Sequence, residues 1–305
     1  MSAPQPRPPG TGYVEHLIDF YDAFAEHYDA WAEGLHGRVA ARLAEIAKAR
    51  PREAALDVGA GTGLVTHLVA AGVGRRGEVI GIDLSEGMLQ VARRAARANT
   101  RFMGMPAERL IFRDSTFDLV TYGLSLGMLV DPRTSLAEAH RVLRPGGRVA
   151  IASLRRSLDT ESQDVFYAVV RGLLRDHPLR LPDPPGGRGR FGEPDVQRGL
   201  LEAAGFGRVE VVEMVTGGRA PDVSRWVDLM AGSGPLPHTL ISALGPGLRD
   251  RLEADLEAAL APLGEDAYRH HHAFSFALGV KPGEPGRRGR SGQGRERRTA
   301  SGSMA

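Results

Sequence analysis

The 305-residue sequence predicts an α/β fold in which helices separate the strands of a parallel, doubly wound β-sheet. First, short apolar runs of strand length alternate with helical periodicity through residues 53–154. Second, a glycine-rich turn at residues 59–63 follows the first apolar run. Third, Asp83 stands at the end of the second run. Ligands of such sheets bind beyond the carboxyl ends of the strands, so the turn and Asp83 predict a ligand site at that edge.

Each element follows from the period of its apolar residues. Ser85 suits the N-cap of the second helix, and the sequence Arg-Pro-Gly-Gly after residue 143 closes the third. Alternating apolar residues mark the later strands, and glycine and proline break up the helices between them. Strands are expected at 53–58, 78–84, 100–105, 116–124, 148–154, 206–215 and 268–280, and helices at 63–72, 85–98, 135–143, 162–176, 194–205 and, as two or three helices, within 219–266.

Composition excludes several classes of protein. The chain has no cysteine, so it has no disulfide, no thiolate nucleophile and no cysteine-based metal site. No run approaches the roughly 18 to 20 apolar residues that span a bilayer, and the first residues form no secretion signal, so we expect a cytoplasmic protein.

The last residues are basic. Residues 281–305 carry seven basic and two acidic side chains, although the whole chain has a net charge of only +2. Such a tail can attract the phosphates of nucleic acid. It can equally be a solvated, disordered end, and its lack of apolar residues favours that interpretation. The proline-rich residues 1–12 are interpreted in the same way.

The residues around the glycine turn narrow the choice of ligand. The dinucleotide fingerprint G-x-G-x-x-G requires glycine at position 64, where the chain has Leu64. Asp57 precedes the turn and would repel a pyrophosphate, whereas an acidic neighbour suits a cation. Asp83 is placed to accept hydrogen bonds from the 2′- and 3′-hydroxyls of a ribose. The sequence therefore predicts a nucleoside that carries an ammonium or sulfonium group and no pyrophosphate.

Four segments carry a resemblance to a known family. LDVGAGTG, VIGIDLSEGMLQVARRAA, AERLIFRDSTFDLV and EAHRVLRPGGRVAIAS stand in this order. They resemble the motifs of class I S-adenosylmethionine-dependent methyltransferases, most closely the group typified by the ubiquinone/menaquinone-biosynthesis C-methyltransferases and related small-molecule enzymes. The resemblance covers about residues 14–215. It implies S-adenosylmethionine as cofactor and a seven-stranded Rossmann-like sheet whose last strand is antiparallel, which residues 268–280 fit.

The sequence also predicts a domain organisation. A cap precedes the core, and a helical insertion before the last strand has a composition that suits a lid over an apolar or aromatic acceptor. Ordinary packing between helices explains any single residue of this insertion equally well. The expected parts are a disordered N-terminus at 1–12, a helical cap at 13–50, the cofactor-binding core at 51–218, a helical lid or substrate insertion at 219–266, the final strand at 267–281 and a disordered Arg/Gly-rich tail at 282–305.

Site residues follow from the resemblance position by position. The turn residues Gly59, Ala60, Gly61 and Gly63 lie against the methionine and ribose parts of the cofactor, and Asp57 lies near its amino group. Asp83 takes the ribose hydroxyls. Leu84 and Met88 line the adenine or are simply core residues. Tyr122, Gly123 and Ser125 lie beside the methionine tail of the cofactor, although Ser125 can instead be only a helix cap.

One position departs from the family pattern. The third strand is commonly followed there by Gly-Asp, whose aspartate accepts from the adenine amino group, whereas this chain has Met105 and Pro106. Adenine recognition then depends on the backbone at Ala107 and Glu108, or on the Glu108 side chain. One lost hydrogen bond is worth about 1 kcal/mol, so binding is expected to weaken rather than disappear.

The N-terminal segment is amphipathic. Apolar and aromatic residues recur along one face of it as a stripe, which consists of Leu17, Tyr21, Phe24, Tyr28 and Trp31. This face either packs on the sheet as a cap or, through Tyr21 and Tyr28, closes over the methionine end of the cofactor.

Catalytic residues are poorly encoded, because in-line methyl transfer from a sulfonium needs mainly positioning and desolvation. His16 and His27 are candidate general bases, although the sequence favours surface or hydrogen-bonded histidines at both positions. His238 is a third candidate and is equally explained by packing between helices. Arg38 can reach a cofactor or substrate carboxylate, although an ordinary structural role is favoured there too. No metal site is expected at Arg-His-His-His, residues 269–272, because successive strand residues point to opposite faces.

The predicted function is methylation of a small molecule, an apolar or aromatic secondary metabolite or a quinone-like ring, at carbon, oxygen or nitrogen. The first alternative is a non-methylating reaction such as cyclisation on the same fold. The second is an RNA-directed protein that acts through its basic tail. The sequence does not encode the oligomeric state.

Overall fold

A computed structural model describes residues 11–30, 34–155, 160–173, 175, 190–231, 241 and 244–283. Trp31, His238, the first ten residues and residues 284–305 lie outside this set, so the disorder expected of both ends stays a prediction. Helix α1 (Thr11–Phe24) already includes residues 11 and 12, which the sequence assigned to the N-terminal tail.

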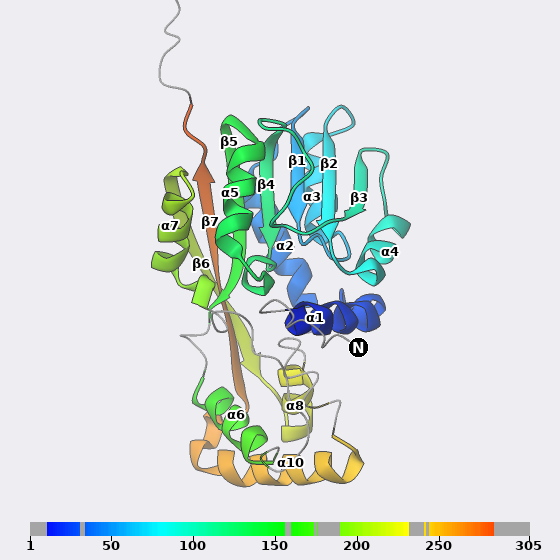
Figure 1. Cartoon of the computed structure of the whole chain (residues 1–305). Helices are drawn as coiled ribbons and strands as arrows, with labels where there is room; N and C mark the ends of the chain where they lie inside the picture. Colours follow the sequence, from blue (N-terminus) through cyan, green and yellow to red (C-terminus); the bar gives the residue numbers. More distant parts are fainter. Residues whose placement is uncertain are drawn as a thin grey trace, which may run out of the picture.

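The strands form one seven-stranded sheet in the order β3-β2-β1-β4-β5-β7-β6 (Figure 1). Strands β1 to β5 pair in parallel, and β7 is antiparallel to both of its neighbours, as predicted. The strand order reverses between β1 and β4, and this switch point is where open α/β sheets bind ligands. The strands are β1 (Ala54–Val58), β2 (Glu78–Asp83), β3 (Thr100–Gly104), β4 (Phe117–Gly123), β5 (Leu143–Arg155), β6 (Gly207–Arg219) and β7 (Arg269–Val280).

Helices cover both faces of the sheet, because parallel strands are apolar on both sides. On one face, α2 (Leu35–Ala47) and α3 (Leu64–Val73) pack their buried side chains on β1, β4 and β5. On the other, α5 (Pro132–Val142) packs mainly on β5, and α7 (Pro194–Ala203) packs on β6 and β7. Helix α4 (Glu86–Arg94) follows β2 and begins at the N-cap Ser85, as predicted.

The predicted cap, residues 13–50, divides into two parts. Helix α2 belongs to the face of the sheet, since Leu43 and Ala47 are fully buried there. Helix α1 instead lies across the carboxyl ends of the parallel strands (Figure 1). The short helix η1 (Ala25–His27) follows α1 directly. Only α1 and η1 are therefore placed to cover the switch point.

A separate helical unit lies beyond the same edge. Strands β6 and β7 continue past the sheet as a two-stranded ribbon and end on α6 (Glu161–Leu173), α8 (Val223–Ala231) and α10 (Pro246–Leu260) (Figure 1). Phe166, Trp226 and Leu256 are fully buried in a hydrophobic core of its own. The sequence assigned α6 to the cofactor-binding core, but its apolar face packs on α10 and α8, so α6 belongs to this unit.

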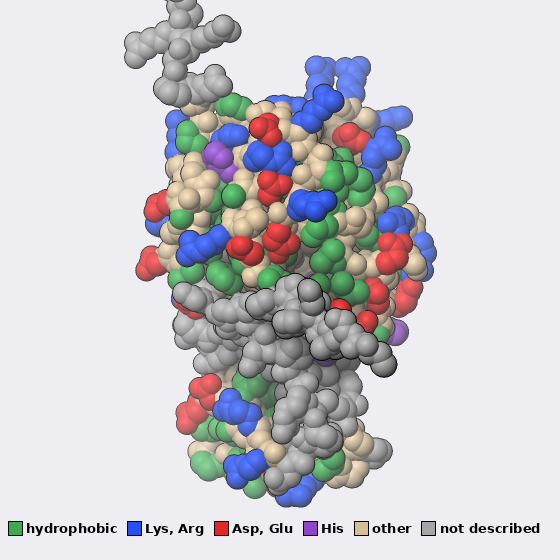
Figure 2. All heavy atoms as spheres, viewed as in Figure 1, with side chains coloured by type: hydrophobic (Ala, Val, Ile, Leu, Met, Phe, Trp, Pro, Cys, Tyr) green, Lys and Arg blue, Asp and Glu red, His purple; other side chains and the backbone are tan. Residues whose placement is uncertain are grey.

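Charges of both signs are interspersed on the visible face of the sheet-containing part (Figure 2). Several ion pairs of the described residues are exposed, as between Arg101 and Glu78. Within the described part of the chain, no helix has the length and apolar character needed to cross a membrane.

Within the described part of the chain, the ion pair between Arg148 and Glu53 is largely buried. Arg148 at the start of the parallel part of β5 is 6% exposed and donates to both carboxylate oxygens of Glu53 at 2.8 Å. It also donates to the carbonyl oxygens of Ala47 and Lys48, both at 2.6 Å. One guanidinium therefore joins the end of α2, the entry to β1 and the middle of the sheet.

We predict that Arg148→Ala lowers the free energy of unfolding by about 3–5 kcal/mol, because the buried Glu53 carboxylate and two carbonyl groups lose their donor. Denaturant unfolding measures this loss. Arg101→Ala, which breaks the exposed pair with Glu78, is the matched control and should cost less than about 1 kcal/mol. Equal losses in the two variants would contradict the role given to Arg148.

Candidate active site

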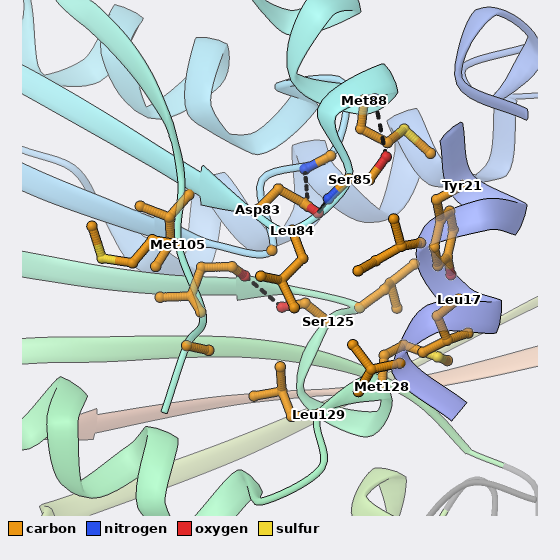
Figure 3. Close-up of a pocket in the computed structure, with 18 of the residues that line it drawn as sticks. Leu17, Tyr21, Asp83, Leu84, Ser85, Met88, Met105, Ser125, Met128 and Leu129 are labelled. Atoms are coloured by element: carbon orange, nitrogen blue, oxygen red, sulfur yellow. Dashed lines mark hydrogen bonds between the residues drawn. The ribbon is translucent and has the colours of Figure 1, made fainter. Parts of the chain in front are cut away.

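A cavity of about 150 Å³ lies at the switch point, beneath α1. Figure 3 shows side chains from α1, from the ends of β2 and β4 and from the segment after β3 converging on it. A smaller hollow of about 40 Å³ lies on the α2 side of the glycine turn. The two share five lining residues, which are Tyr28, Gly59, Gly61, Gly123 and Leu124.

The glycine turn is bent tightly onto β2. The backbone N–H groups of Gly59 and Ala60 both donate to the carbonyl oxygen of Ile82, at 2.8 and 2.9 Å. A Cβ at Gly59 would lie 2.3 Å from that of Ser125. At Gly61, which has a φ of +55°, a Cβ would meet nothing within 4 Å. Gly59 is therefore required by the protein's own packing, whereas Gly61 leaves its backbone open to a ligand.

Asp83 joins the turn to the start of α4. Its Oδ2 accepts from the N–H of Gly61 at 2.8 Å, and its Oδ1 accepts from the N–H of Ser85 at 3.0 Å. Burial raises the pKa of this carboxyl above its ordinary value. The side chain lines the larger cavity (Figure 3). Each oxygen has further lone pairs, so Asp83 can also accept hydrogen bonds from a ligand.

Asp57 lies beneath the turn and is 1% exposed. Its oxygens accept from the hydroxyls of Thr66 and Thr121, both at 2.7 Å. Burial raises the pKa of this carboxyl to about 6, although the threonine hydroxyls partly oppose the shift. Asp57 lines the smaller hollow. A ligand in the larger cavity therefore experiences its charge across the turn.

The electrostatic character of the site is negative. Asp29, after η1, accepts from the hydroxyl of Thr62 in the turn at 2.5 Å, so the carboxylates of Asp29, Asp57 and Asp83 flank the turn. Neither lysine nor arginine lines the two hollows in the part of the chain that the structure describes. This arrangement favours a cationic ligand.

Two tyrosines and a histidine lie above the turn. Tyr21 and Tyr28 line the larger cavity, and burial raises the pKa of both phenols, so they stay neutral. The ring of His36 stacks on that of Tyr28 with centroids 4.4 Å apart. Burial lowers the pKa of His36 to about 4, and the side chain lines the smaller hollow. No spacing pattern in the sequence points to His36, and we did not predict it.

The segment after β3 forms another wall. Met105, Ala107 and Glu108 line the cavity together with Leu84 and Met88. The N–H of Met105 donates to the carbonyl oxygen of Asp83 at 3.1 Å, which holds this segment against β2. Leu84 is 45% exposed, so the possibility that it is only a core residue is wrong.

Several predicted residues lie elsewhere. The side chain of Tyr122 is fully buried, its hydroxyl lies 2.8 Å from that of Ser135, and it does not line either hollow. The Cβ position of Gly63 faces His67 and Phe102 instead of the cavity. Ala60 lines only the smaller hollow, and the residues that line neither are Gly63, Tyr122, His16, His27 and Arg38. Gly123 and Ser125 do line the larger cavity, and direct contact of any of these residues with a cofactor stays a prediction.

The far wall of the cavity is apolar. Leu17 of α1 lies beside Met128 of η3 (Leu126–Met128) (Figure 3), and Ile18 and Leu129 also line the cavity. The hydroxyl of Tyr13 donates to Met128 Sδ at 3.9 Å and joins α1 to this loop. Sequence reasoning identified Leu17 as one of an amphipathic stripe, but it missed the residues after β4 that face it.

The side chains of the histidines near the start of β7 are divided between the two sides of the strand. His270 and His272 lie on one side of the strand with ring centroids 5.7 Å apart. Within the described residues, no three histidine, aspartate or glutamate side chains are grouped so that they could bind a metal ion.

The raised pKa of Asp57 predicts a pH dependence for binding of the expected cationic cofactor. A bound cation stabilises the carboxylate and lowers its pKa, so affinity should fall as pH falls through about 6 and level off above it. Calorimetry between pH 5 and pH 7.5 tests this. Asp57→Asn should flatten the profile around pH 6, and a wild-type profile that is already flat would contradict the prediction.

Comparison with known proteins identifies the family. The model of a methyltransferase domain matches residues 56–151. A demethylmenaquinone methyltransferase of Symbiobacterium thermophilum is 38% identical over 157 residues, which are 48% of this chain and 62% of that relative. The nocamycin O-methyltransferase of Saccharothrix syringae is 32% identical over 219 residues, 64% of this chain and 72% of the relative.

A solved structure agrees with the fold. The YcgJ protein of Bacillus subtilis has a TM-score of 0.55 at 19% identity, and the match covers 80% of this chain and 98% of that one. Sequence motifs, strand order and relatives agree with one another. The chain belongs to the class I S-adenosylmethionine-dependent methyltransferases, in the group typified by the ubiquinone/menaquinone-biosynthesis C-methyltransferases.

Proposed function

We propose that the protein methylates an apolar, ring-containing small molecule, such as a quinone-like ring or an aromatic secondary metabolite. One observation carries the proposal: a single cavity joins the carboxylate-flanked glycine turn to an apolar wall formed by α1 and η3. The first part suits a cationic nucleoside, and the second suits an apolar acceptor.

The residues around the turn fit S-adenosylmethionine. The backbone of Gly61 is open to approach, and the carboxylates of Asp29, Asp57 and Asp83 complement a ligand that carries ammonium and sulfonium charges. Asp83 would accept from the ribose hydroxyls. Leu84, Met88 and Met105 provide the apolar surface for an adenine ring, and Glu108 provides a carboxylate for its edge.

When bound, the cofactor supplies a methyl group on a positively charged sulfur, which is already an activated leaving group. The chain's own task is to exclude water and to orient the acceptor in line with that bond. Leu17, Ile18 and Leu129 exclude water from the apolar side.

The titratable groups of the cavity indicate where a proton from the acceptor would go. The phenols of Tyr21 and Tyr28 are held neutral by burial, so they do not serve as bases at neutral pH. A proton from the hydroxyl of a phenol, an enol or a reduced quinone would instead pass to a carboxylate that lines the cavity, Asp83 or Glu108. The names of two relatives, a demethylmenaquinone methyltransferase and an O-methyltransferase, support acceptors of this kind.

The decisive experiment incubates the protein with methyl-labelled S-adenosylmethionine and a panel of hydroxylated quinols and phenols. We expect label in the product, found by mass spectrometry. A converted acceptor without label would refute methyl transfer and favour the alternative, a non-methylating reaction such as cyclisation.

A truncation tests the nucleic-acid alternative. Lys281 donates to the carbonyl oxygens of His140 and Leu143, at 2.7 and 2.8 Å, so it belongs to the folded body and should be kept. A chain that ends at residue 283 removes most of the basic tail. We expect it to keep the methyl-transfer rate of the full chain, and a rate that depends on the tail and on added RNA would support the alternative.

We predict that Asp83→Asn weakens S-adenosylmethionine binding about tenfold or more, because the variant loses a charged acceptor for the ribose and for Gly61. Calorimetry measures the dissociation constant. Glu78→Gln, at the opposite and exposed end of the same strand, is the control and should bind as the wild type does. Unchanged binding in Asp83→Asn would show that the ribose lies elsewhere.

A further inference from the structure

Helix α1 and the residues after it make polar contacts with three separate loops of the cofactor site. Tyr13 donates to Met128 after β4, and Asp29 accepts from Thr62 in the glycine turn. Between these two contacts, Asp22 meets the turn from β2 to α4, the turn that also carries Asp83. Among the described residues of α1, only Tyr13 is buried, at 7% exposure, so polar contacts add to the half-buried apolar side chains in holding the helix in place.

The contact at Asp22 comprises two hydrogen bonds. Its Oδ1 accepts from the Ser85 hydroxyl at 2.5 Å and from the Gly87 N–H at 2.8 Å. A Cβ at Gly87 would lie 2.8 Å from Asp22 Cα and 2.9 Å from its carbonyl oxygen. Backbone atoms cannot rotate away from such a clash, so α1 can approach this closely only because residue 87 is glycine.

Ser85 connects this contact to Asp83, the carboxylate expected to bind the ribose. Its hydroxyl donates to Asp22, and its backbone N–H donates to Asp83 Oδ1. The same Ser85 Oγ accepts from the Met88 N–H and caps α4. A change in the position of α1 is therefore transmitted to Ser85 and from there to Asp83.

Helix α1 also forms a wall of the cavity. Leu17, Ile18 and Tyr21 line it, and Asp22 follows directly in the chain. When α1 leaves the β2–α4 turn, the cavity loses this wall and Asp83 loses the fixed position of its neighbour Ser85.

We propose that Asp22 is a positioning residue for the cofactor site, which docks α1 on the turn carrying Asp83 so that S-adenosylmethionine is retained only while α1 is docked. The proposal rests on the family's cofactor occupying the cavity. Asp22 itself does not line the cavity, so it acts through Ser85 and through the placement of α1.

Gly87→Ala tests the close approach without removing a polar group. Alanine is a better helix former than glycine by up to about 1 kcal/mol, so α4 itself should not be weakened. The added methyl group should displace α1 and raise the dissociation rate of S-adenosylmethionine about tenfold in stopped-flow experiments. Gly199→Ala is the matched control, since Gly199 lies in helix α7 with nothing within 4 Å of its Cβ position and should leave the rate unchanged.

Asp22 variants test the hydrogen bonds. Asp22→Ala should weaken binding about tenfold, and Asp22→Asn, whose side-chain oxygen can still accept, should restore most of the loss. Asp22 is exposed and Ser85 already caps α4, so both variants should fold. Hydrogen exchange in the absence of cofactor should show faster exchange at residues 11–24 in Asp22→Ala and in Gly87→Ala but not in Gly199→Ala.

The possible results are distinguishable. Wild-type protein that fails to bind S-adenosylmethionine would overturn the proposed function, while the exchange measurement would still test the docking of α1. Normal wild-type binding, together with unchanged dissociation and exchange in Gly87→Ala and Asp22→Ala, would overturn only the role of Asp22.

Discussion

The site depends on the absence of a side chain at Gly59. The turn after β1 lies so close to Ser125 that a Cβ would overlap with it, and two successive N–H groups of this turn share the carbonyl oxygen of Ile82. This close packing brings the ends of β1, β2 and β4 to one point. It also fixes Gly61 where its N–H meets Asp83 and its open side faces the cavity. The packing of the backbone at this turn thus determines where the carboxylates around it lie.

Charge in turn determines which nucleoside the turn can bind. The glycines alone suit a pyrophosphate as well as a sulfonium compound, because both need close approach to the backbone. Carboxylates beneath and beside the turn, with no lysine or arginine among the described lining residues, separate the two cases. Burial makes the carboxylates of Asp57 and Asp83 costly to ionise, and a bound cation offsets that cost. The ionised carboxylates are therefore less stable without a bound cation than with one.

The sequence predicted the sheet well because strand and helix periods are local properties. Each predicted strand of the sheet is present, although β5 begins at Leu143 instead of residue 148 and β6 runs on to Arg219. Turn residues such as Gly61 and Asp83 were also predictable, because their spacing along the chain reflects the strand–turn–helix unit. Tyr122 shows the limit of that approach, since the alternation along β4 directs its side chain into the core. Contacts between distant segments gave no local signal. His36 beside Tyr28, Asp22 beside Gly87, and α6 against α10 all depend on tertiary packing.

The ribbon that joins the helical unit to the sheet has a mechanical consequence. A flexible linker would let the unit reorient freely, whereas two paired strands that continue from the sheet restrict it to bending. Gly217 and Gly218 lie in β6 opposite His271 and His270, and the Gln163 side chain of α6 is hydrogen-bonded to the backbone of His271 in the same stretch. The helical unit is therefore fixed to the ribbon, while its hydrophobic core is separate from that of the sheet. Sequence changes inside this separate core can accumulate without disturbing the packing of the cofactor-binding turn.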